Sequence, residues 1–413
     1  MVNANLYKNR KLVACLDLSS SKLMCIIANI GSDGIDILGY SHQESKGITA
    51  GAISDIKLAQ KAIANVVAEA EKMAGLNIDE IFVAINDSQL KSSYCDVSEK
   101  IHKEVVQPQT IKSVVDKARI FASKNQRIPI HIIPLQYCID DSDVIDNPRY
   151  MSGNKLHARF HILSSSPTVI SNIENCFKRC KLSIDDYISS CYATSIACLK
   201  ENERKAGVLL IDIGSNSTSF CILIDEKIIY SSSISLGGRN ITKDIATIIG
   251  IKLISAEKVK ILNSTLILSP LEEQELINYR NLEILEEATN RMPNRLELSK
   301  IIQYRLEEIL EAVIANLEQV KITLDAIPSI VITGGVANTV GIDKLIKEFC
   351  GKNTRIGYPP KFENHDLNLS NLNNNCILGM LLHLQNNFNK NQNLQHDANE
   401  GWLKKFLNKF IKE

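Results

Sequence analysis

Short apolar runs separated by polar turns open the chain, and this pattern predicts strands of one sheet. Residues 12–18 and 23–30 are apolar, and the four residues 19–22 between them have the length of a hairpin connection. Residues 35–40 form a third apolar run after a glycine-containing turn. The chain is therefore expected to begin with three consecutive strands.

A helix and a short strand are expected next, and after them the sequence pattern changes. The helix is predicted over about residues 55–74, where apolar residues recur at helical spacing before Gly75, and the strand over 81–85. Residues 87–161 are expected to be a separate inserted module. It should contain a helix at 108–123, a proline-punctuated strand region at 128–137 and a turn-rich segment at 140–153.

The opening pattern occurs a second time about 195 residues later. Asp17, near the end of the first strand, is matched by Asp212, near the end of an apolar run over residues 207–213. A turn of small residues and two more strands, at 219–224 and 228–235, complete the repeat. Strand, aspartate, small-residue hairpin and strand thus occur twice, which predicts a duplicated fold.

The second half ends in a different mixture of elements. Residues 245–324 are rich in helical periodicity, and residues 329–333 form a buried strand that leads into a Thr-Gly-Gly turn. A helix over 374–384 is expected to close the body. Residues 385–400 are polar, rich in Asn and Gln and without a period, so a flexible linker is predicted there.

The last thirteen residues, 401–413, are predicted to form an amphipathic helix on a membrane surface. At about 100° per residue, aromatic and aliphatic residues lie opposite the lysines, which is typical of an interfacial helix. Such a short helix folds only as it binds, so several tails on one oligomer should bind much more tightly than one. The alternative is a last helix docked on the body. The expected membrane-binding residues are Trp402, Leu403, Phe406, Leu407, Phe410, Ile411, Lys404, Lys405, Lys409 and Lys412.

Composition narrows the function classes. Lys plus Arg and Asp plus Glu are both 47, and a net charge of zero argues against nucleic acid as the main ligand. Eleven cysteines without paired metal-ligand spacing favour a reducing cytosol. The first residues have no apolar core of a signal peptide, and no run is long enough to span a bilayer. Membrane contact is therefore expected from the cytoplasmic side.

The repeated hairpins have the chemistry of a phosphate site. Small residues expose successive backbone N–H groups, which can hold phosphate oxygens. The aspartates Asp17 and Asp212 could each bind a divalent cation through water. The turn at Gly334 and Gly335 would let the backbone approach the flat base of an adenosine.

Several further motifs follow in order along the chain. They are Ile132-Ile133-Pro134, Met151-Ser152-Gly153, Ser235-Leu236-Gly237-Gly238, Ile241-Thr242-Lys243-Asp244-Ile245, Ala256-Glu257-Lys258-Val259-Lys260, Arg305-Leu306-Glu307-Glu308-Ile309 and Arg355-Ile356-Gly357-Tyr358-Pro359. With two phosphate hairpins and an adenosine turn, the chain resembles the actin, sugar-kinase and heat-shock-chaperone superfamily and, within it, the FtsA family of bacterial cell-division proteins. The match covers roughly residues 12–384 and, after a gap, the C-terminal helix.

The resemblance implies an α/β, actin- and Hsp70-like fold of two lobes with duplicated sheets and an FtsA-type insert. The implied units are subdomain 1A (1–86 and 162–203), subdomain 1C (87–161), subdomain 2A (204–244 and 325–384), subdomain 2B (245–324), the linker 385–400 and the tail 401–413. The implied site binds ATP and Mg²⁺, with Glu257 and Lys260 at the ribose or adenine. Its candidate residues are Asp17, Ser19, Ser20, Ser21, Lys22, Asp212, Gly214, Ser215, Asn216, Ser217, Gly238, Glu257, Lys260, Gly334, Gly335 and Val336, with Asp17 and Asp212 as candidate metal residues.

The resemblance also implies a role. An FtsA-like chain would polymerise, bind anionic lipids and tether FtsZ to the inner face of the cytoplasmic membrane at the division site, where other division proteins join it. FtsZ binding would fall on subdomain 2B. Two alternatives are a small-molecule kinase of the same superfamily and a pilus-assembly scaffold with the same fold.

Some residues depart from the family pattern. Ser19 stands where the family usually has glycine, Ser215 and Asn216 replace glycines, and Ser219 stands where an acidic residue is typical. A Cβ at these positions limits the approach of backbone to phosphate. ATP hydrolysis is therefore expected to be weak at most, and the sequence identifies no general base; Asp185 and Asp186 are expected to be surface acids.

Overall fold

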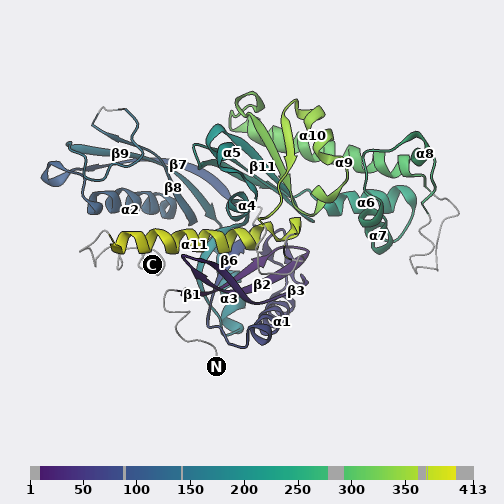
Figure 1. The fold of residues 1–413 in the computed structure, drawn as a ribbon, viewed down its shortest axis with the longest axis horizontal. Helices are drawn as coiled ribbons and strands as arrows, with labels where there is room; N and C mark the ends of the chain where they lie inside the picture. The colour runs from purple at the N-terminus through teal and green to yellow at the C-terminus, as the bar shows by residue number, and fades with distance from the viewer. Residues whose placement is uncertain are drawn as a thin grey trace.

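The computed structural model describes residues 10–86, 90–140, 143–277, 293–360, 369 and 371–396, with the side chains of 103 and 391–396 left out. Two lobes and an inserted subdomain form an elongated molecule (Figure 1). Each lobe is built on one five-stranded sheet. The tail predicted at 401–413 lies outside the described residues.

The two sheets have the same topology, which confirms the duplication. In the first, the order is β10-β6-β1-β2-β3, and in the second β15-β14-β11-β12-β13. In both, the central strand pairs antiparallel with the next strand in sequence and parallel with a later one. The strands are β1 (Arg10–Leu18), β2 (Lys22–Gly31), β3 (Gly34–Glu44), β6 (Glu80–Ile85), β10 (Ser183–Ser189), β11 (Val208–Ile213), β12 (Thr218–Ile224), β13 (Lys227–Ile234), β14 (Ser329–Thr333) and β15 (Asn353–Ile356), with a small β4–β5 pair at Ile48–Thr49 and Ala52–Ile53.

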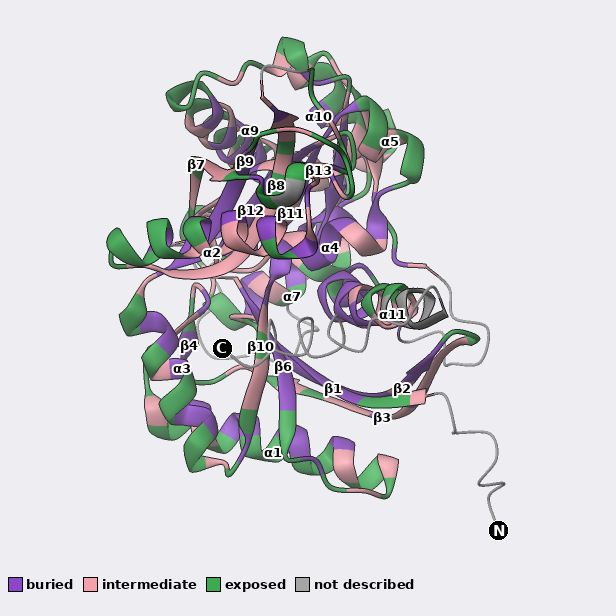
Figure 2. Cartoon of the chain, turned by 90° about the vertical axis from the view of Figure 1, so that its left-hand side faces the viewer, coloured by how far each residue is buried: buried purple, intermediate pink, exposed green. Residues whose placement is uncertain are grey.

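Helices cover both faces of the sheets because the strands are apolar on both faces (Figure 2). On the first sheet, α1 (Ile56–Ala74) and α3 (Pro167–Arg179) pack on one face and α11 (Asn375–His396) on the other. The second sheet packs against α6 (Gly238–Ile249), α7 (Leu253–Asn263), α9 (Arg295–Gln319) and α10 (Ile342–Cys350). Helix α4 (Ser190–Cys198) lies between the lobes, whereas α5 (Glu201–Ala206) lies beside the second sheet, and the short α8 spans Pro270–Glu273.

The inserted subdomain has its own core. Three antiparallel strands in the order β7-β9-β8 pack on helix α2 (Pro108–Lys124) through buried residues such as Val114 and Phe160. Its strands are β7 (Lys91–Lys100), β8 (Ile128–Ile139) and β9 (Lys155–Ser165). The sequence predicted α2 and most of β8, but not β7 or β9, and β9 continues past the expected boundary at residue 161.

The linker prediction for 385–400 is wrong over its first part. Helix α11 does not end near Leu384 but continues to His396. The amide of Gln385 donates to the carbonyl of Gly31 (3.1 Å), and Phe388 packs on the core of the first lobe. These tertiary contacts stabilise a helix in a segment whose Asn-rich composition does not favour one. No helix among the described residues is long and apolar enough to cross a membrane.

Candidate functional site

The first hairpin joins β1 and β2 at the edge of the first sheet that faces the second lobe. The hairpin is tightly closed, because the strand register pairs Leu18 with Leu23. The hydroxyl of Ser19 donates to the carbonyl of Lys22. The ammonium of Lys22 reaches 3.2 Å to the amide oxygen of Asn374, just before α11. This hairpin therefore places one cation beside its turn.

The second hairpin joins β11 and β12 in the same way. Its turn is closed by a bond from Gly214 N–H to Ser217 O (3.0 Å). The carbonyls of Gly214 and Ser215 accept from Gly238 N–H (2.9 Å) and Arg239 N–H (2.7 Å) at the start of α6. These bonds lock the hairpin to α6. Asn86, at the end of β6, donates to Ser217 Oγ at 3.5 Å and so links the two lobes.

The Thr-Gly-Gly turn after β14 lies directly against the second hairpin. Gly334 has a φ of +88°, and a Cβ there would fall 2.4 Å from Asp212 Oδ1. Only glycine is suited to both the positive φ and this close approach. A Cβ on Gly238 would fall 2.8 Å from Val336, so the start of α6 is packed equally closely against the same turn.

The two repeated aspartates lie near enough to each other for their charges to interact. Burial and then the charge of Asp212 raise the pKa of Asp17, while the Cys376 thiol and Lys22 lower it, and the net result is a pKa of about 7. Burial also raises the pKa of Asp212 to about 6, and Thr194 donates to it at 3.4 Å. Two buried carboxylates that repel each other need a cation or a proton.

A second polar cluster lies on α7 at the predicted adenosine end. Lys260 Nζ donates to Glu257 Oε2 (2.7 Å), Thr242 Oγ1 (2.7 Å) and Gly238 O (3.1 Å). All three ammonium protons are therefore used within the cluster. Lys260 accordingly orients the half-exposed Glu257 carboxylate rather than pointing freely at a ligand.

The residues of the site fit a magnesium–nucleotide ligand. Asn216 Oδ1 is buried and finds no donor among the described residues, as expected for an acceptor that faces a hydrated ion or a ligand hydroxyl. The paired aspartates supply the oxygen donors that magnesium prefers. No group of three or more His, Cys, Asp and Glu residues in the described ranges could hold a metal without a ligand or water.

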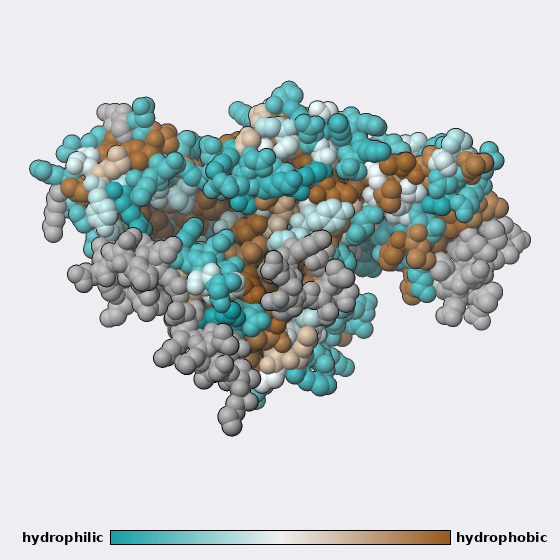
Figure 3. Space-filling model, in the orientation of Figure 1, coloured by the Kyte–Doolittle hydropathy of each residue, from teal (hydrophilic) through white to brown (hydrophobic). Residues whose placement is uncertain are grey.

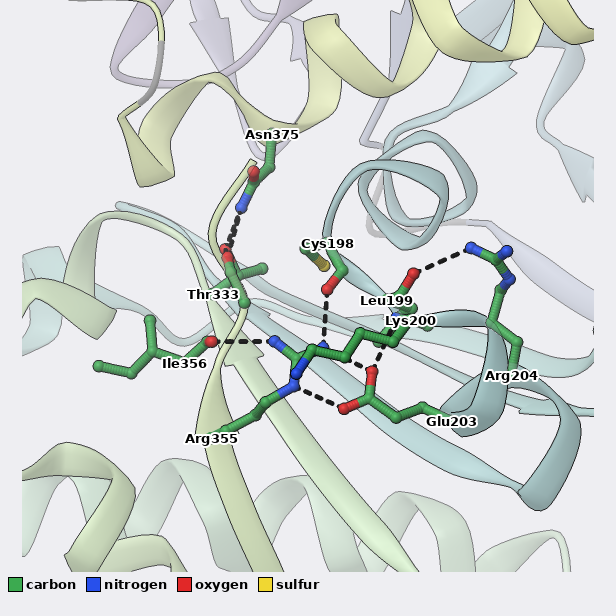
Figure 4. A network of polar contacts seen from close by, with 10 residues as sticks. Cys198, Leu199, Lys200, Glu203, Arg204, Thr333, Arg355, Ile356 and Asn375 are labelled. Atoms are coloured by element: carbon green, nitrogen blue, oxygen red, sulfur yellow. Dashed lines mark hydrogen bonds and ion pairs between the residues drawn. The ribbon is translucent and has the colours of Figure 1, made fainter. Parts of the chain in front are cut away.

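Sequence reasoning missed the residues that join the walls of the site. Asn375 Nδ2 donates to Thr333 Oγ1 and, at 2.8 Å, to Gly357 O, so the start of α11 is fixed to the end of β14 (Figure 4). Cys376 lies against Asp17, and Thr194 lies against Asp212. These contacts join segments far apart in the sequence, and no local spacing indicates them.

The carboxylates weighed as general bases lie elsewhere. Asp185 and Asp186 sit in an irregular stretch of β10 between Ile184 and Tyr187, whereas the cleft lies beyond the end of that strand. Asp186 accepts a 2.8 Å bond from Tyr187 N–H, and burial raises its pKa to about 6. The Asp186 side chain is nevertheless exposed and that of Asp185 is half-buried, so the surface position expected from the sequence is confirmed for Asp186.

Comparison with solved structures identifies the class of fold. A PilM–PilN type IV pilus biogenesis complex matches 90% of this chain and 98% of its own with a TM-score of 0.61 at 16% identity. MreB 5 of Spiroplasma citri bound to AMPPNP matches 93% of this chain and 98% of its own with a TM-score of 0.58 at 15% identity. The chain thus has the actin-like, two-lobed α/β fold that was predicted.

Sequence comparison identifies the family within that class. The family model "Cell division protein FtsA" matches residues 209–373, and the model "SHS2 domain inserted in FTSA" matches residues 87–164. The chain is 29% identical to the cell division protein FtsA of Borreliella burgdorferi over 92% of this chain and 93% of the relative. It is 27% identical to that of Buchnera aphidicola over 98% and 99%. The chain belongs to the FtsA family, and its role is an actin-like one in cell division.

Proposed function

We propose that this chain is a nucleotide-dependent membrane adaptor of cell division. It binds ATP with Mg²⁺, associates with copies of itself, and tethers FtsZ filaments to the cytoplasmic face of the membrane at the division site, where other division proteins join. The observation that carries the proposal is the convergence of Asp17, Asp212 and Gly334 from three separate segments. Family membership supplies FtsZ as the partner.

The cleft binds the nucleotide with backbone and side chains together. The hairpin amides at 19–21 and 215–217 donate to phosphate oxygens, and Lys22 offsets their negative charge. Asp17 and Asp212 hold a hydrated Mg²⁺, which supplies the positive charge that two adjacent carboxylates and a polyphosphate require. The Glu257 carboxylate, held by Lys260, accepts from the sugar hydroxyls.

Hydrolysis is slow in this proposal. Ser219 follows the second hairpin where the family typically has an acid, and its buried hydroxyl finds no partner among the described residues. A serine hydroxyl is far too weak a base to activate water at neutral pH. The bound nucleotide therefore acts mainly as a structural ligand.

Self-association uses an apolar surface of the second lobe. Ile254, Ile261 and Leu262 on α7 are each about 70% exposed. Figure 3 shows apolar side chains gathered over this helix. An exposed apolar patch of this kind marks an interaction site, and a second copy of this chain is the occupant expected of an actin-like protein.

FtsZ contacts the same subdomain at a different place. A cleft of about 580 Å³ lies between α6 and α9, lined by residues such as Ile248, Tyr304 and Arg305. Its wall is rigid because Arg305 makes a paired contact with Asp244 (2.5 and 2.8 Å). Apolar and charged lining together suit a short peptide segment.

The test is co-sedimentation with anionic liposomes, using the full chain and a chain truncated after Asn399, each with and without FtsZ and ATP. We expect the full chain to recruit FtsZ to liposomes, and the truncated chain to bind FtsZ but leave both in solution. Lipid binding that survives truncation would show that the tail is not the anchor. Lipid binding without recruitment of FtsZ would refute the adaptor, and turnover of a sugar in a coupled assay would favour a kinase.

A further inference from the structure

The inserted subdomain belongs to the first lobe by sequence, but it is fastened to the second lobe by contacts. The neutral ring of His161 in β9 donates from Nδ1 to the carbonyl of Ile228 in β13 (2.9 Å). Its Nε2 lies 2.9 Å from the hydroxyl of Ser92 in β7. His161 is fully buried, so this contact is part of the packed interior.

Four more hydrogen-bond contacts hold the insert to the edge strand of the second sheet. Ser92 Oγ lies 2.6 Å from Ser231 O and accepts from Ser231 N–H at 3.0 Å. The hydroxyl of Tyr94 donates to Ile229 O at 2.6 Å. Lys227 of β13 donates in return to Leu135 O in β8 at 3.0 Å. The edge of the second sheet is thus covered by the insert, which protects it from pairing elsewhere.

The insert also contacts the first lobe, where Ile128 and Ile130 of β8 pack on its core and one histidine makes a polar contact. His131 in β8 accepts from the backbone N–H of Ser189 at the end of β10 (2.9 Å). Its ring packs on Tyr192 in α4 with centroids 4.6 Å apart. Tyr192 in turn contacts His383 of α11, with its hydroxyl 3.3 Å from Nδ1. A single packed stack therefore joins the insert, the helix between the lobes and the C-terminal helix.

Helix α4 connects this stack to the candidate nucleotide site. Tyr192 holds the insert, Ala193 touches α11, where a Cβ on Gly379 would fall 1.8 Å from its carbonyl, and Thr194 donates to Asp212. Beyond the end of α4, Arg355 of β15 donates to Cys198 O (2.9 Å) and pairs with Glu203 (Figure 4). A shift of α4 at Asp212 cannot leave the insert in place, because close-packed contacts transmit displacement.

We propose that the inserted subdomain is a strut between the lobes, through which the occupancy of the Asp17–Asp212 cleft sets the orientation of the insert. The proposal rests on the proposed function, since nucleotide binding is the event that moves the lobes. Its two attachment points are the Ser92–Tyr94–His161 bonds to β13 and the His131–Tyr192 stack on α4. Closure of the cleft must then either turn the insert or break one attachment.

The test is amide hydrogen exchange in β7 of the full chain, with and without ATP and Mg²⁺. In the unsubstituted chain we expect ATP to change the exchange rates about fivefold or more, as for a typical coupling between sites. The double variant Ser92→Ala/Tyr94→Phe removes two hydroxyls that bond β13, of which that of Ser92 also contacts His161. In it the change should fall below about twofold while ATP still binds. Lys227→Met removes the bond that β13 donates to the insert. This variant should also reduce the ATP-induced change in the exchange rates of β7.

Ser113→Ala is the matched control, since that hydroxyl bonds to Glu99 within the insert and touches neither lobe. It should leave the response intact. Equilibrium dialysis with ATP separates the outcomes. Binding of ATP without any change in β7, or an unchanged response in the double variant, overturns the strut alone. Absence of ATP binding overturns the proposed function and the strut together.

Discussion

The two halves of the molecule have the same backbone plan but meet the cleft with different chemistry. Asp17 pairs in register with Ala84, and Asp212 with Thr333, so the end of β6 corresponds to the end of β14. At the equivalent next positions the first half has Ile85 and Asn86, and the second has the two glycines of the adenosine turn. Of these four residues, Asn86 is the one that extends a side chain to the other half.

The difference teaches what each copy of the duplication contributes. The first half brings polar side chains to the cleft: the ammonium of Lys22, the hydroxyl of Ser19 and the amide of Asn86. The second half brings bare backbone at Gly238 and Gly334, which pack too closely for any side chain, in addition to side chains such as Asn216 and Glu257. Substitutions of these glycines should therefore damage folding, and those of the polar side chains of the first half should mainly alter the affinity for nucleotide.

The largest effect is expected from Gly334→Ala. The new Cβ would combine a left-handed φ with a collision against Asp212 and Ile213, so we expect a loss of roughly 3 to 5 kcal/mol in the free energy of unfolding. Urea denaturation measures it. Gly351→Ala is the control, because its φ is also positive but nothing lies within 4 Å of its Cβ. It should lose only about 1 to 2 kcal/mol, and equal losses would refute the collision.

The next effect is a gain in stability from Asp17→Asn. Because the pKa of Asp17 in the fold is about 7, well above the ordinary aspartate value of 3.8, its contribution to stability is full at acid pH and is lost as the pH rises through 7. At about 1.4 kcal/mol per pKa unit, the ionised carboxylate costs the fold on the order of 2 to 4 kcal/mol at pH 8. The variant should regain most of this in the absence of magnesium.

Unfolding at pH 5 and pH 8, with and without Mg²⁺, checks this expectation. Mg²⁺ should stabilise the unsubstituted chain at pH 8 and have little effect on Asp17→Asn. Asp212→Asn should behave in the same way but gain less stability, since the pKa of Asp212 is raised only to about 6. Asp96→Asn, on the surface of the insert, should change nothing. A variant no more stable than the parent at pH 8 would contradict the raised pKa.

Much of the fold could be predicted from the sequence, because buried strands leave an unambiguous apolar pattern. The runs that became β1, β2, β11 and β14 are buried almost throughout. β7 was missed because its polar residues face solvent or the lobes, and only Cys95 is fully buried along it. β10 contains two adjacent aspartates, and the end of α11 is rich in Asn, so neither has the composition of its element.

The site was predictable only where its residues are neighbours in the sequence. Both hairpins and the glycine turn are local patterns, and the structure brings all three together. The partners of these residues are distant: Lys22 and Asn374 are 352 positions apart, and Thr194 reaches Asp212 from a separate helix. Their role depends on tertiary packing, which one sequence without an alignment does not reveal.

A smaller effect, on binding alone, is expected from Lys22→Met. A charge-assisted contact to phosphate contributes about 1.5 to 3 kcal/mol, so ATP affinity should fall about 10- to 100-fold. Stability should change less than affinity, because burial lowers the pKa of Lys22 more than the charge of Asp17 raises it, and its hydrogen-bond acceptor in the protein is one amide oxygen. Calorimetric titration with ATP measures the loss. Lys46→Met, on the exposed segment after β3, is the control. An equal loss of ATP affinity in this variant would show that Lys22 acts only through the net charge of the protein and not through a contact with the phosphates.

The smallest effect separates the two hairpins themselves. Ser19→Gly removes the hydroxyl that closes the first turn onto Lys22 O, and it adds backbone freedom to the unfolded chain. Together these should lower the free energy of unfolding by about 1 to 2 kcal/mol. Ser215→Gly keeps the Arg239 N–H to Ser215 O bond and the Gly214–Ser217 closure, so it should lose less than about 1 kcal/mol. If Ser215→Gly proved the more damaging, the second hairpin would depend on its side chains and not on its backbone.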